Sequence, residues 1–129
     1  MVDITPPIPD GKQLIDRYGD QQFLISGKAY YSIVLVCEIN TYELPSNNIE
    51  NLLSENSELI LSKVGADRPG CILIIGTGDQ TVWPKEETLT PFKEAGLIVE
   101  VMNTGAACRT FNVLQSESRD VSALLLPVG

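Results

Sequence analysis

Apolar residues fall into short runs along this chain, and two of these runs contain no polar position. Residues 33–37 and 71–75 are apolar throughout, a pattern typical of strands that are covered on both faces. Residues 97–102 and 121–126 are two further strand candidates. The sequence therefore predicts a sheet with buried central strands.

The first third of the chain predicts a β meander. Residues 13–18 and 23–25 are short strand candidates. Gly27–Lys28 follows as a turn, because glycine adopts a positive φ at little cost. The longest strand candidate runs over residues 29–37, and residues 40–45 are expected to form a connection.

Helical spacing of apolar residues follows over residues 48–64. Ser46 or Asn47 is the expected N-cap. A polar interruption near residue 56 predicts a possible break, and Gly65 is expected to end the helix. The apolar stripe consists of Ile49, Leu52, Leu53, Ile60 and Val64.

A second helix is expected over residues 85–95, although this segment contains Pro91. A proline costs about 3 kcal/mol in a helix interior because it lacks an N–H and clashes with the preceding turn. The helix therefore either begins at Thr90, with the proline in its first turn, or is kinked.

The last helix is expected to begin at an Asn103 or Thr104 cap and to end near Ser116. Its apolar face packs on the sheet. Arg109, Asn112 and Ser116 form the remaining polar face.

The order strand–helix–strand over residues 71–102 predicts two parallel neighbouring strands. Only a short turn, residues 117–120, precedes the closing strand, so we expect that strand to be antiparallel or placed at an edge. The fold class is therefore α/β, a three-layer sandwich around a mixed, partly parallel sheet with an N-terminal β meander. Residues 1–129 form a single domain, and residues 1–11, which contain three prolines, form an extended N-terminal arm.

Charge argues against several partners. The chain carries 9 Lys and Arg against 17 Asp and Glu, a formal net charge of −8. Nucleic acids and anionic membrane surfaces attract clustered Lys and Arg, so neither is an expected partner. The longest apolar runs are too short to cross a bilayer as helices, and we expect no membrane insertion.

The chain contains no histidine. This removes Ser-His-Asp and Cys-His nucleophile pairs and the most common metal ligand. Cys37, Cys71 and Cys108 are far apart and have no CxxC spacing. We therefore expect reduced thiols in a cytoplasmic protein, with no metal site and no cofactor. Catalysis would have to use carboxylates, lysine, tyrosine or a thiolate.

Two glycine-containing turns follow two neighbouring strands. We expect residues 76–79 and 103–105 to lie side by side, because parallel neighbours in a β-α-β unit end at the same edge of the sheet. Gly76 and Gly78 stand where a dinucleotide fingerprint would begin, but Thr81 occupies the place of its third glycine. The alternative is a tight turn that clears the next helix.

The cleft between these turns is a candidate site for a small anion. The free N–H groups and the positive dipole end of a helix attract anions, and Arg109 lies close by. The alternative is ordinary capping, with Arg109 paired to Asp79 or Glu100. The candidate ligand-binding residues are Gly76, Thr77, Gly78, Asp79, Asn103, Thr104, Gly105 and Arg109.

Two other side chains are candidates for function. Cys108 lies just inside the last helix, where the dipole can lower a thiol pKa and favour a nucleophile. Because no histidine assists it, a small buried hydrophobe is the favoured alternative. Trp83 and Tyr42 are candidate interface anchors, and the alternative for Trp83 is that it covers the core.

One string of the last helix is specific enough to compare with known families. Residues 104–114 read TGAACRTFNVL. Together with the Gly76-Thr77-Gly78 turn, Gly96, residues 99–102 and the Leu126-Pro127 ending, this string resembles a small single-domain family of unknown biochemistry. The family occurs in bacteria and archaea, and its mitochondrial members include an assembly factor for respiratory complex I, the NADH:ubiquinone oxidoreductase.

The resemblance spans roughly residues 15–127 and implies a three-layer α/β sandwich around a mixed sheet. It implies no catalytic residues. Thr104, Gly105, Arg109 and Asn112 match the family string, and a structural role is the alternative for each. The N-terminal arm lacks the Arg-rich, acid-poor pattern of mitochondrial targeting, so we expect a bacterial cytoplasmic member.

Two functions from different classes fit these expectations. The first is a non-catalytic protein-interaction or assembly module with an unidentified protein partner, which the missing histidines, the acidic charge and the resemblance favour. The second is a small anionic-ligand binder, or an enzyme, that uses the cleft between residues 76–79 and 103–105 and grips the anion with Arg109 and Thr104. Thiol chemistry at Cys108 is a third, weaker hypothesis. The sequence indicates no oligomeric state.

Overall fold

The computed structural model describes residues 1–3, 11–65 and 70–129. Most of the arm predicted at residues 1–11 lies outside the described residues. Its first residues contribute a short strand, β1 (Val2–Asp3).

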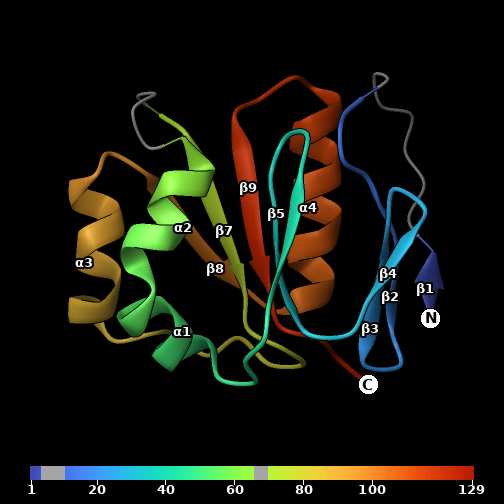
Figure 1. Cartoon of the computed structure of the whole chain (residues 1–129), viewed down its shortest axis with the longest axis horizontal. Coiled ribbons are helices and arrows are strands. Elements are labelled where there is room, and N and C mark those ends of the chain that lie inside the picture. The colour runs from blue at the N-terminus through green and yellow to red at the C-terminus, as the bar shows by residue number, and fades with distance from the viewer. Residues whose placement is uncertain (4–10, 66–69) are drawn as a thin grey trace.

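A five-stranded mixed sheet forms the centre of the molecule (Figure 1). Its strands are β5 (Ile33–Val36), β6 (Thr41–Leu44), β7 (Ile72–Gly76), β8 (Ile98–Met102) and β9 (Val121–Leu125). The strand order is β6-β5-β9-β7-β8. β7 is parallel to both β8 and β9, whereas β5 is antiparallel to both β9 and β6. The prediction of a mixed, partly parallel sheet is confirmed.

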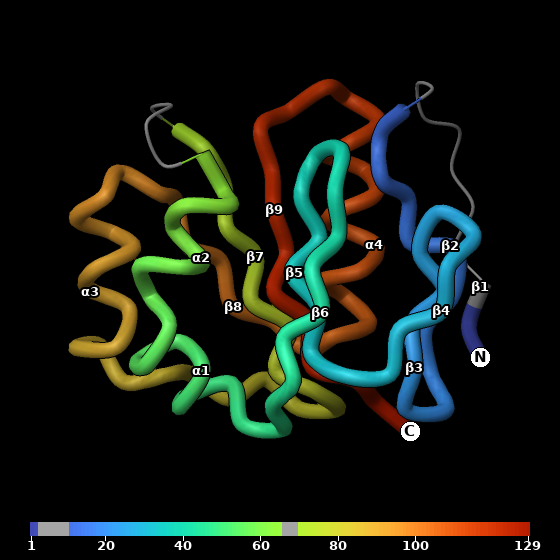
Figure 2. The backbone as a smooth tube through the Cα atoms, viewed as in Figure 1, coloured from blue at the N-terminus to red at the C-terminus, as the bar shows by residue number. Residues whose placement is uncertain are grey.

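A smaller antiparallel sheet precedes it in the chain. The small sheet contains β1, β2 (Ile15–Gly19), β3 (Gln22–Ile25) and β4 (Lys28–Tyr30), in chain order. This arrangement confirms the N-terminal meander. Figure 2 shows the chain passing from β4 into β5 of the central sheet, and the C-terminal end returning toward the small sheet. There the Gln21 N–H donates a hydrogen bond of 2.7 Å to the Val128 carbonyl.

Two strand predictions in this region are wrong. The single strand predicted over residues 29–37 is divided between β4 and β5. Tyr31 at the junction is 68% exposed, because the chain leaves one sheet there before it enters the other. The connection predicted over residues 40–45 contains β6 instead. Pro45 lies just beyond the end of this edge strand, where its missing N–H breaks no ladder.

Helices complete the three layers. They are α1 (Ile49–Glu55), α2 (Ser57–Val64), α3 (Glu86–Glu94) and α4 (Thr104–Ser116). Figure 1 shows α1, α2 and α3 on one face of the central sheet and α4 on the other, and the small sheet packs into the same apolar cluster as α4. The predicted three-layer sandwich is confirmed.

Strand β5 shows why its sequence has no polar position. Val34 and Val36 pack into the cluster that contains α4 and the small sheet. Ile33 and Leu35 pack into the cluster beneath α1, α2 and α3. Since successive side chains of a strand point to opposite faces, a strand covered on both faces needs an apolar residue at every position.

The helical segment at residues 48–64 is broken at Asn56, as predicted. Its cap differs from the prediction. Asn48, rather than Ser46 or Asn47, is the N-cap of α1, and its side chain accepts a hydrogen bond from the Asn51 N–H. Gly65 ends α2 in the left-handed conformation, with φ of 68°, as predicted.

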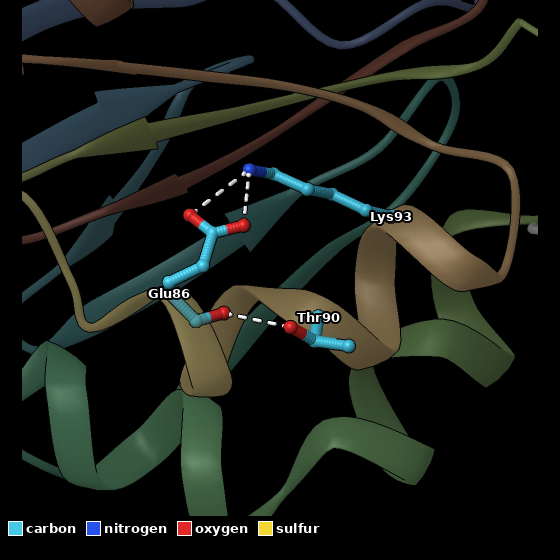
Figure 3. Close-up of polar contacts among 3 residues, drawn as sticks. All are labelled: Glu86, Thr90 and Lys93. Carbon is cyan, nitrogen blue, oxygen red and sulfur yellow. Dashed lines mark hydrogen bonds and ion pairs between the residues drawn. The ribbon is translucent and has the colours of Figure 1, made fainter.

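Helix α3 runs from Glu86 through Pro91, so the predicted start at Thr90 is wrong. Two contacts support its first turn, and Figure 3 shows both. The Thr90 hydroxyl donates to the Glu86 carbonyl at 2.9 Å, and Lys93 Nζ lies 3.0 Å from Glu86 Oε1. Pro91 removes the donor for the Glu87 carbonyl, and Glu87 lies on the solvent-exposed side of the helix.

The position predicted for the closing strand is also wrong. β9 lies in the middle of the sheet, parallel to β7, although it is antiparallel to β5. The short connection at residues 117–120 joins a helix to a strand, not two strands. Helix α4 is itself the crossover from β8, so a parallel strand follows despite the short turn.

Of the polar face predicted for α4, Asn112 is covered by the N-terminal part of the chain, whereas Arg109 is exposed. Asn112, which is buried, forms two hydrogen bonds with the backbone of Ile15 in β2. Its Oδ1 accepts from the Ile15 N–H at 3.0 Å, and its Nδ2 donates to the Ile15 carbonyl at 2.9 Å. One turn later, Gln115 Nε2 donates to the Glu38 carbonyl at 2.9 Å and to the Gln13 carbonyl at 3.2 Å. These side chains attach β2 and the segment before it to α4.

We predict that an Asn112→Ala variant is less stable than the parent by about 3 kcal/mol. The substitution leaves the buried N–H and C=O of Ile15 unpaired, and each unpaired group costs about 1–3 kcal/mol. Urea denaturation measures the change. Val113→Ala on the exposed side of the same helix is the control, with an expected change within about 0.5 kcal/mol. Equal stabilities of the two variants would contradict the attachment role of Asn112.

Candidate functional site

The turn after β7 and the start of α4 are in direct contact, as the parallel-strand rule predicts. The Gly78 N–H donates to Thr104 Oγ1 at 2.9 Å, and the Thr104 N–H donates to the Gly78 carbonyl at 2.9 Å. The Thr77 N–H donates to the Met102 carbonyl at 2.9 Å. Residues 76–79 and 103–105 therefore form one hydrogen-bonded unit.

Thr104 connects this unit to a third segment. Its hydroxyl donates to the Leu126 carbonyl, just after β9, at 2.7 Å. The side chain is fully buried, and its oxygen both donates and accepts. One threonine thus joins the ends of β7 and β9 to the start of α4.

The two glycines of the first turn serve close packing. A Cβ at Gly76 would lie 2.9 Å from Leu125 Cδ2 and 3.2 Å from the Thr104 Cα, and neither approach is tolerated without movement. Gly78 has φ of 101°, a conformation that favours glycine. These contacts support the tight-turn interpretation of the Gly-x-Gly pattern.

The rest of the first turn is organised by Thr77, whereas Asp79 is exposed to solvent. The Thr77 hydroxyl donates to the Gln80 carbonyl at 2.6 Å and accepts from the Val82 N–H at 2.9 Å. These two bonds fix the loop that leads to Trp83.

The first turn of α4 is capped and covered. Asn103 is the N-cap, and its Oδ1 accepts from the Ala106 N–H at 2.9 Å. A Cβ at Gly105 would lie 2.8 Å from the Tyr18 hydroxyl, so Tyr18 of the small sheet lies against this turn. Arg109 Nη1 donates to the same hydroxyl at 3.0 Å.

Arg109 forms no ion pair with any carboxylate in the part of the chain that the structure describes. The predicted pairing with Asp79 or Glu100 is therefore wrong, and Tyr18 takes the place of the carboxylate. The other part of that alternative, ordinary helix capping, is supported by Asn103, which is the N-cap of α4. Ligand binding by the eight candidate residues remains a prediction, and the contacts described above are structural.

Cys108 is buried in the cluster between α4 and the central sheet. Burial raises the pKa of its thiol from an ordinary value of 9.0 to about 12, and the nearby Arg109 charge opposes this shift only in part. The thiol is therefore protonated at neutral pH, so this environment favours the packing role over the nucleophilic one.

A pocket lies at the carboxyl ends of β7 and β9, next to the turn unit. Its volume is about 240 Å³. Thr77 is the only one of the eight candidate residues that lines it, and Leu126 lines it from the end of β9. The other lining residues, which the sequence did not single out as one site, are Asn47, Asn48, Ile49, Glu50, Val82, Trp83 and Pro84.

Trp83 stands at the edge of this pocket and is 66% exposed. The interpretation that it covers the core is therefore wrong. Val82 beside it is 61% exposed, whereas Pro84 is buried. Tyr42, the other predicted anchor, is half-buried and lies beneath Lys63, whose Nζ is 4.8 Å from the ring centroid.

Glu50 joins the pocket wall to α3. Its Oε1 accepts from the Lys85 N–H at 2.9 Å. The neighbouring Thr88 hydroxyl, followed by the Lys85 N–H, lowers the pKa of the Glu50 carboxyl below its usual value. Glu50 is therefore ionised at neutral pH, and it holds the start of α3 against α1.

The described residues show neither of two other kinds of site. No three or more Cys, Asp or Glu side chains among them are grouped so as to hold a metal ion. None of the helices in residues 1–3, 11–65 and 70–129 combines the length and the apolar character needed to cross a membrane.

These features define a small three-layer α/β domain in which a buried threonine joins two turns beside an apolar pocket. Its family is clear from the sequence. Residues 15–126 match the family described as "Protein of unknown function (DUF498/DUF598)", and the chain belongs to that family. The resemblance inferred from the TGAACRTFNVL string is confirmed.

Two relatives illustrate the range of the family. The "13 kDa major membrane protein" of Francisella tularensis is 30% identical over 112 residues, which cover 85% of this chain and 87% of the relative. "NADH dehydrogenase (ubiquinone) 1 alpha subcomplex assembly factor 3" of Xenopus tropicalis is 33% identical over 114 residues. These residues cover 88% of this chain but only 60% of the assembly factor.

Solved structures support the fold. An outer membrane protein from Bartonella henselae is 28% identical, with a TM-score of 0.77, over 92% of this chain and 98% of that one. A Bordetella pertussis protein described as a Mth938-like domain has a TM-score of 0.78 over 98% of this chain and 92% of that one. At 22% identity, the second likeness concerns the fold alone.

We predict that Thr104→Val destabilises the protein by about 2–4 kcal/mol. Valine keeps the shape of threonine but leaves the Gly78 N–H and the Leu126 carbonyl without their hydroxyl partner. Thermal and urea unfolding measure the effect. Thr81→Val, on the exposed part of the same loop, is the matched control. A Thr104→Val variant as stable as the Thr81→Val variant would disprove the cross-link.

We predict that iodoacetamide does not label Cys108 in the folded protein at pH 7.5 at a measurable rate. The thiol is buried and its pKa is raised to about 12, and only the thiolate reacts. Mass spectrometry after tryptic digestion detects the label, and labelling in guanidinium chloride is the positive control. Labelling of folded protein at the rate of an unstructured peptide would show that Cys108 is reactive.

Proposed function

We propose that this chain is a non-catalytic protein-interaction module that assists the assembly of other proteins. Its contact surface is the exposed Val82–Trp83 segment together with the adjoining pocket. The observation that carries the proposal is the exposure of Trp83. An exposed tryptophan beside an apolar hollow is the arrangement in which interface hot spots occur.

The loop itself supports a binding role for Trp83. The Thr77 hydroxyl holds the loop from within, and Pro84 anchors its end in the protein. The indole is therefore presented on a backbone that is ordered in advance, which lowers the entropy lost on binding. Burial of a tryptophan side chain removes about 150–250 Å² from water.

The chemistry of the chain supports a non-catalytic role. It has no histidine, and its Cys108 thiol is protonated at neutral pH. The polar groups of the two turns contact each other and their neighbours, as in the hydroxyl of Thr104. Relatives named as assembly factors point to protein partners, although the chain spans about 60% of their length.

The proposed place of action is the cytoplasm. Cys37, Cys71 and Cys108 are buried thiols, and reduced cysteines are usual for proteins in a reducing compartment. Some relatives carry the words "membrane protein" in their names. A partner at the cytoplasmic side of a membrane agrees with the buried thiols and with the Francisella name, whereas the name of the Bartonella protein refers to the outer membrane.

We predict that Trp83→Ala abolishes stoichiometric co-purification of a protein partner from native lysate. Removal of a central aromatic anchor weakens binding by about 2 kcal/mol or more, which is about thirtyfold in Kd. Tyr31→Ala removes an aromatic side chain of equal exposure, 68%, and is the matched control. Recovery of the same partner in the same amount with Trp83→Ala would refute the role of this surface.

A further inference from the structure

A second hollow lies between α1 and α3 and adjoins the pocket beside Trp83, because Glu50 lines both; the two hollows together are called the groove. The second hollow has a volume of about 340 Å³ and shares Glu50 with the first. Ile49, Leu126 and the Val82–Pro84 segment make the first hollow largely apolar. Glu87, Thr88 and Ser54 make the second one polar. One groove therefore presents an apolar end and a polar end.

Acidic side chains predominate around the polar end. Glu50 and Glu87 line it together with one cation, Lys85. Glu86 and Lys93 bind each other at 3.0 Å (Figure 3), so they contribute little net charge. The local excess of negative charge has the same sign as the net charge of −8.

Glu50 retains an unused acceptor at the junction of the two hollows. Oε1 is occupied by the Lys85 N–H, whereas Oε2 is shielded and has no hydrogen-bond partner in the part of the chain that the structure describes. The Thr88 hydroxyl lies close enough to lower the Glu50 pKa, but no hydrogen bond of good geometry joins it to Oε2. The negative charge of this carboxylate is therefore only partly compensated within the protein, and it attracts a cation that occupies the polar hollow.

We infer that this groove binds a short peptide segment of a partner protein in which a large apolar side chain is followed or preceded closely by an arginine or lysine. The apolar side chain occupies the hollow beside Trp83, and the cation lies against Glu50 and Glu87. This inference rests on the proposed interaction function and names the chemistry of its partner.

The negative charge of the groove also makes binding of other molecules there unfavourable. A second copy of the chain would bring another acidic groove, and like charges across an interface are repulsive. Nucleic acid and anionic lipid surfaces are repelled for the same reason. A basic segment is attracted from a distance, so its association rate should fall as salt is raised.

The test is selection of binding peptides from a random phage-displayed library on the immobilised protein. We expect enrichment of sequences that combine Leu, Ile, Phe or Trp with a nearby Arg or Lys. One enriched peptide is then synthesised with arginine and with citrulline, its neutral analogue. Binding is followed by isothermal titration calorimetry, which measures the Trp83→Ala variant in the same way as the parent. The citrulline peptide should bind about tenfold more weakly than the arginine peptide.

The matched variants separate the two ends of the groove. Glu50→Gln with Glu87→Gln should reduce the arginine preference to less than about twofold, while binding of the apolar residue persists. Glutamine at position 50 can still accept from the Lys85 N–H, which keeps α3 in place. Glu100→Gln with Glu117→Gln removes the same charge from exposed sites elsewhere and should leave the preference unchanged. Trp83→Ala should weaken the arginine and citrulline peptides equally.

Four results would overturn the inference. They are enrichment without basic residues, equal binding of the arginine and citrulline peptides, an arginine preference unaffected by Glu50→Gln with Glu87→Gln, and a Trp83-dependent dimer in sedimentation. If one of them occurs while co-purification still depends on Trp83, the interaction function stands and only the basic character of the partner is disproved. If instead the peptides bind as expected but co-purification does not depend on Trp83, that result disproves the proposed function separately.

Discussion

The hydroxyl of Thr104 is the contact on which the functional end of this molecule depends. It accepts from Gly78 after β7 and donates to Leu126 after β9, while its own residue begins α4. The Leu126 N–H also donates to the Gly76 carbonyl at 3.0 Å. Three segments that are distant in sequence are thereby held at fixed spacing. Thr77 and Leu126, which line the apolar pocket, take their positions from this arrangement.

A second set of contacts attaches the small sheet to α4, on the face of the central sheet opposite α1, α2 and α3. Asn112 and Gln115 are buried on α4, yet their partners are backbone groups of the N-terminal third. Helix α4 therefore has two structural roles. Its start holds the sheet edge that carries the pocket, and its middle holds the N-terminal meander. A structural role explains Thr104, Gly105, Arg109 and Asn112 of the family string, because each contacts backbone or side chains of another element.

Much of the fold could be predicted from local patterns. The uninterrupted apolar runs gave β5 and β7 correctly as strands covered on both faces, and apolar spacing gave the broken helix that ends at Gly65. The position of β9 could not be predicted. Its neighbours begin about 50 and 90 residues earlier in the chain, and no local signal records which strands will pair. β6 was missed because it has only four residues and ends directly before Pro45, so the segment was interpreted as a connection.

The same limit applies to the site. The contact between residues 76–79 and 103–105 followed from the rule for parallel neighbours, and it is present. The pocket, however, lies between β7 and β9, so it depended on the strand whose position was predicted wrongly. The partner of Arg109 was missed as well, because Tyr18 reaches α4 from another sheet. The sequence feature that could have indicated the pocket was Val82–Trp83, an apolar pair in an otherwise polar loop.

The place of β9 has a consequence for biosynthesis. The strand at the middle of the sheet is synthesised after β5 and β7, so these two strands leave the ribosome without the neighbour that lies between them. Their apolar edges stay unpaired until residues 121–125 emerge, and unpaired edges of this kind favour association with other chains. The nascent chain should therefore depend on chaperones until residue 125 has emerged, and should then close its sheet in a single step.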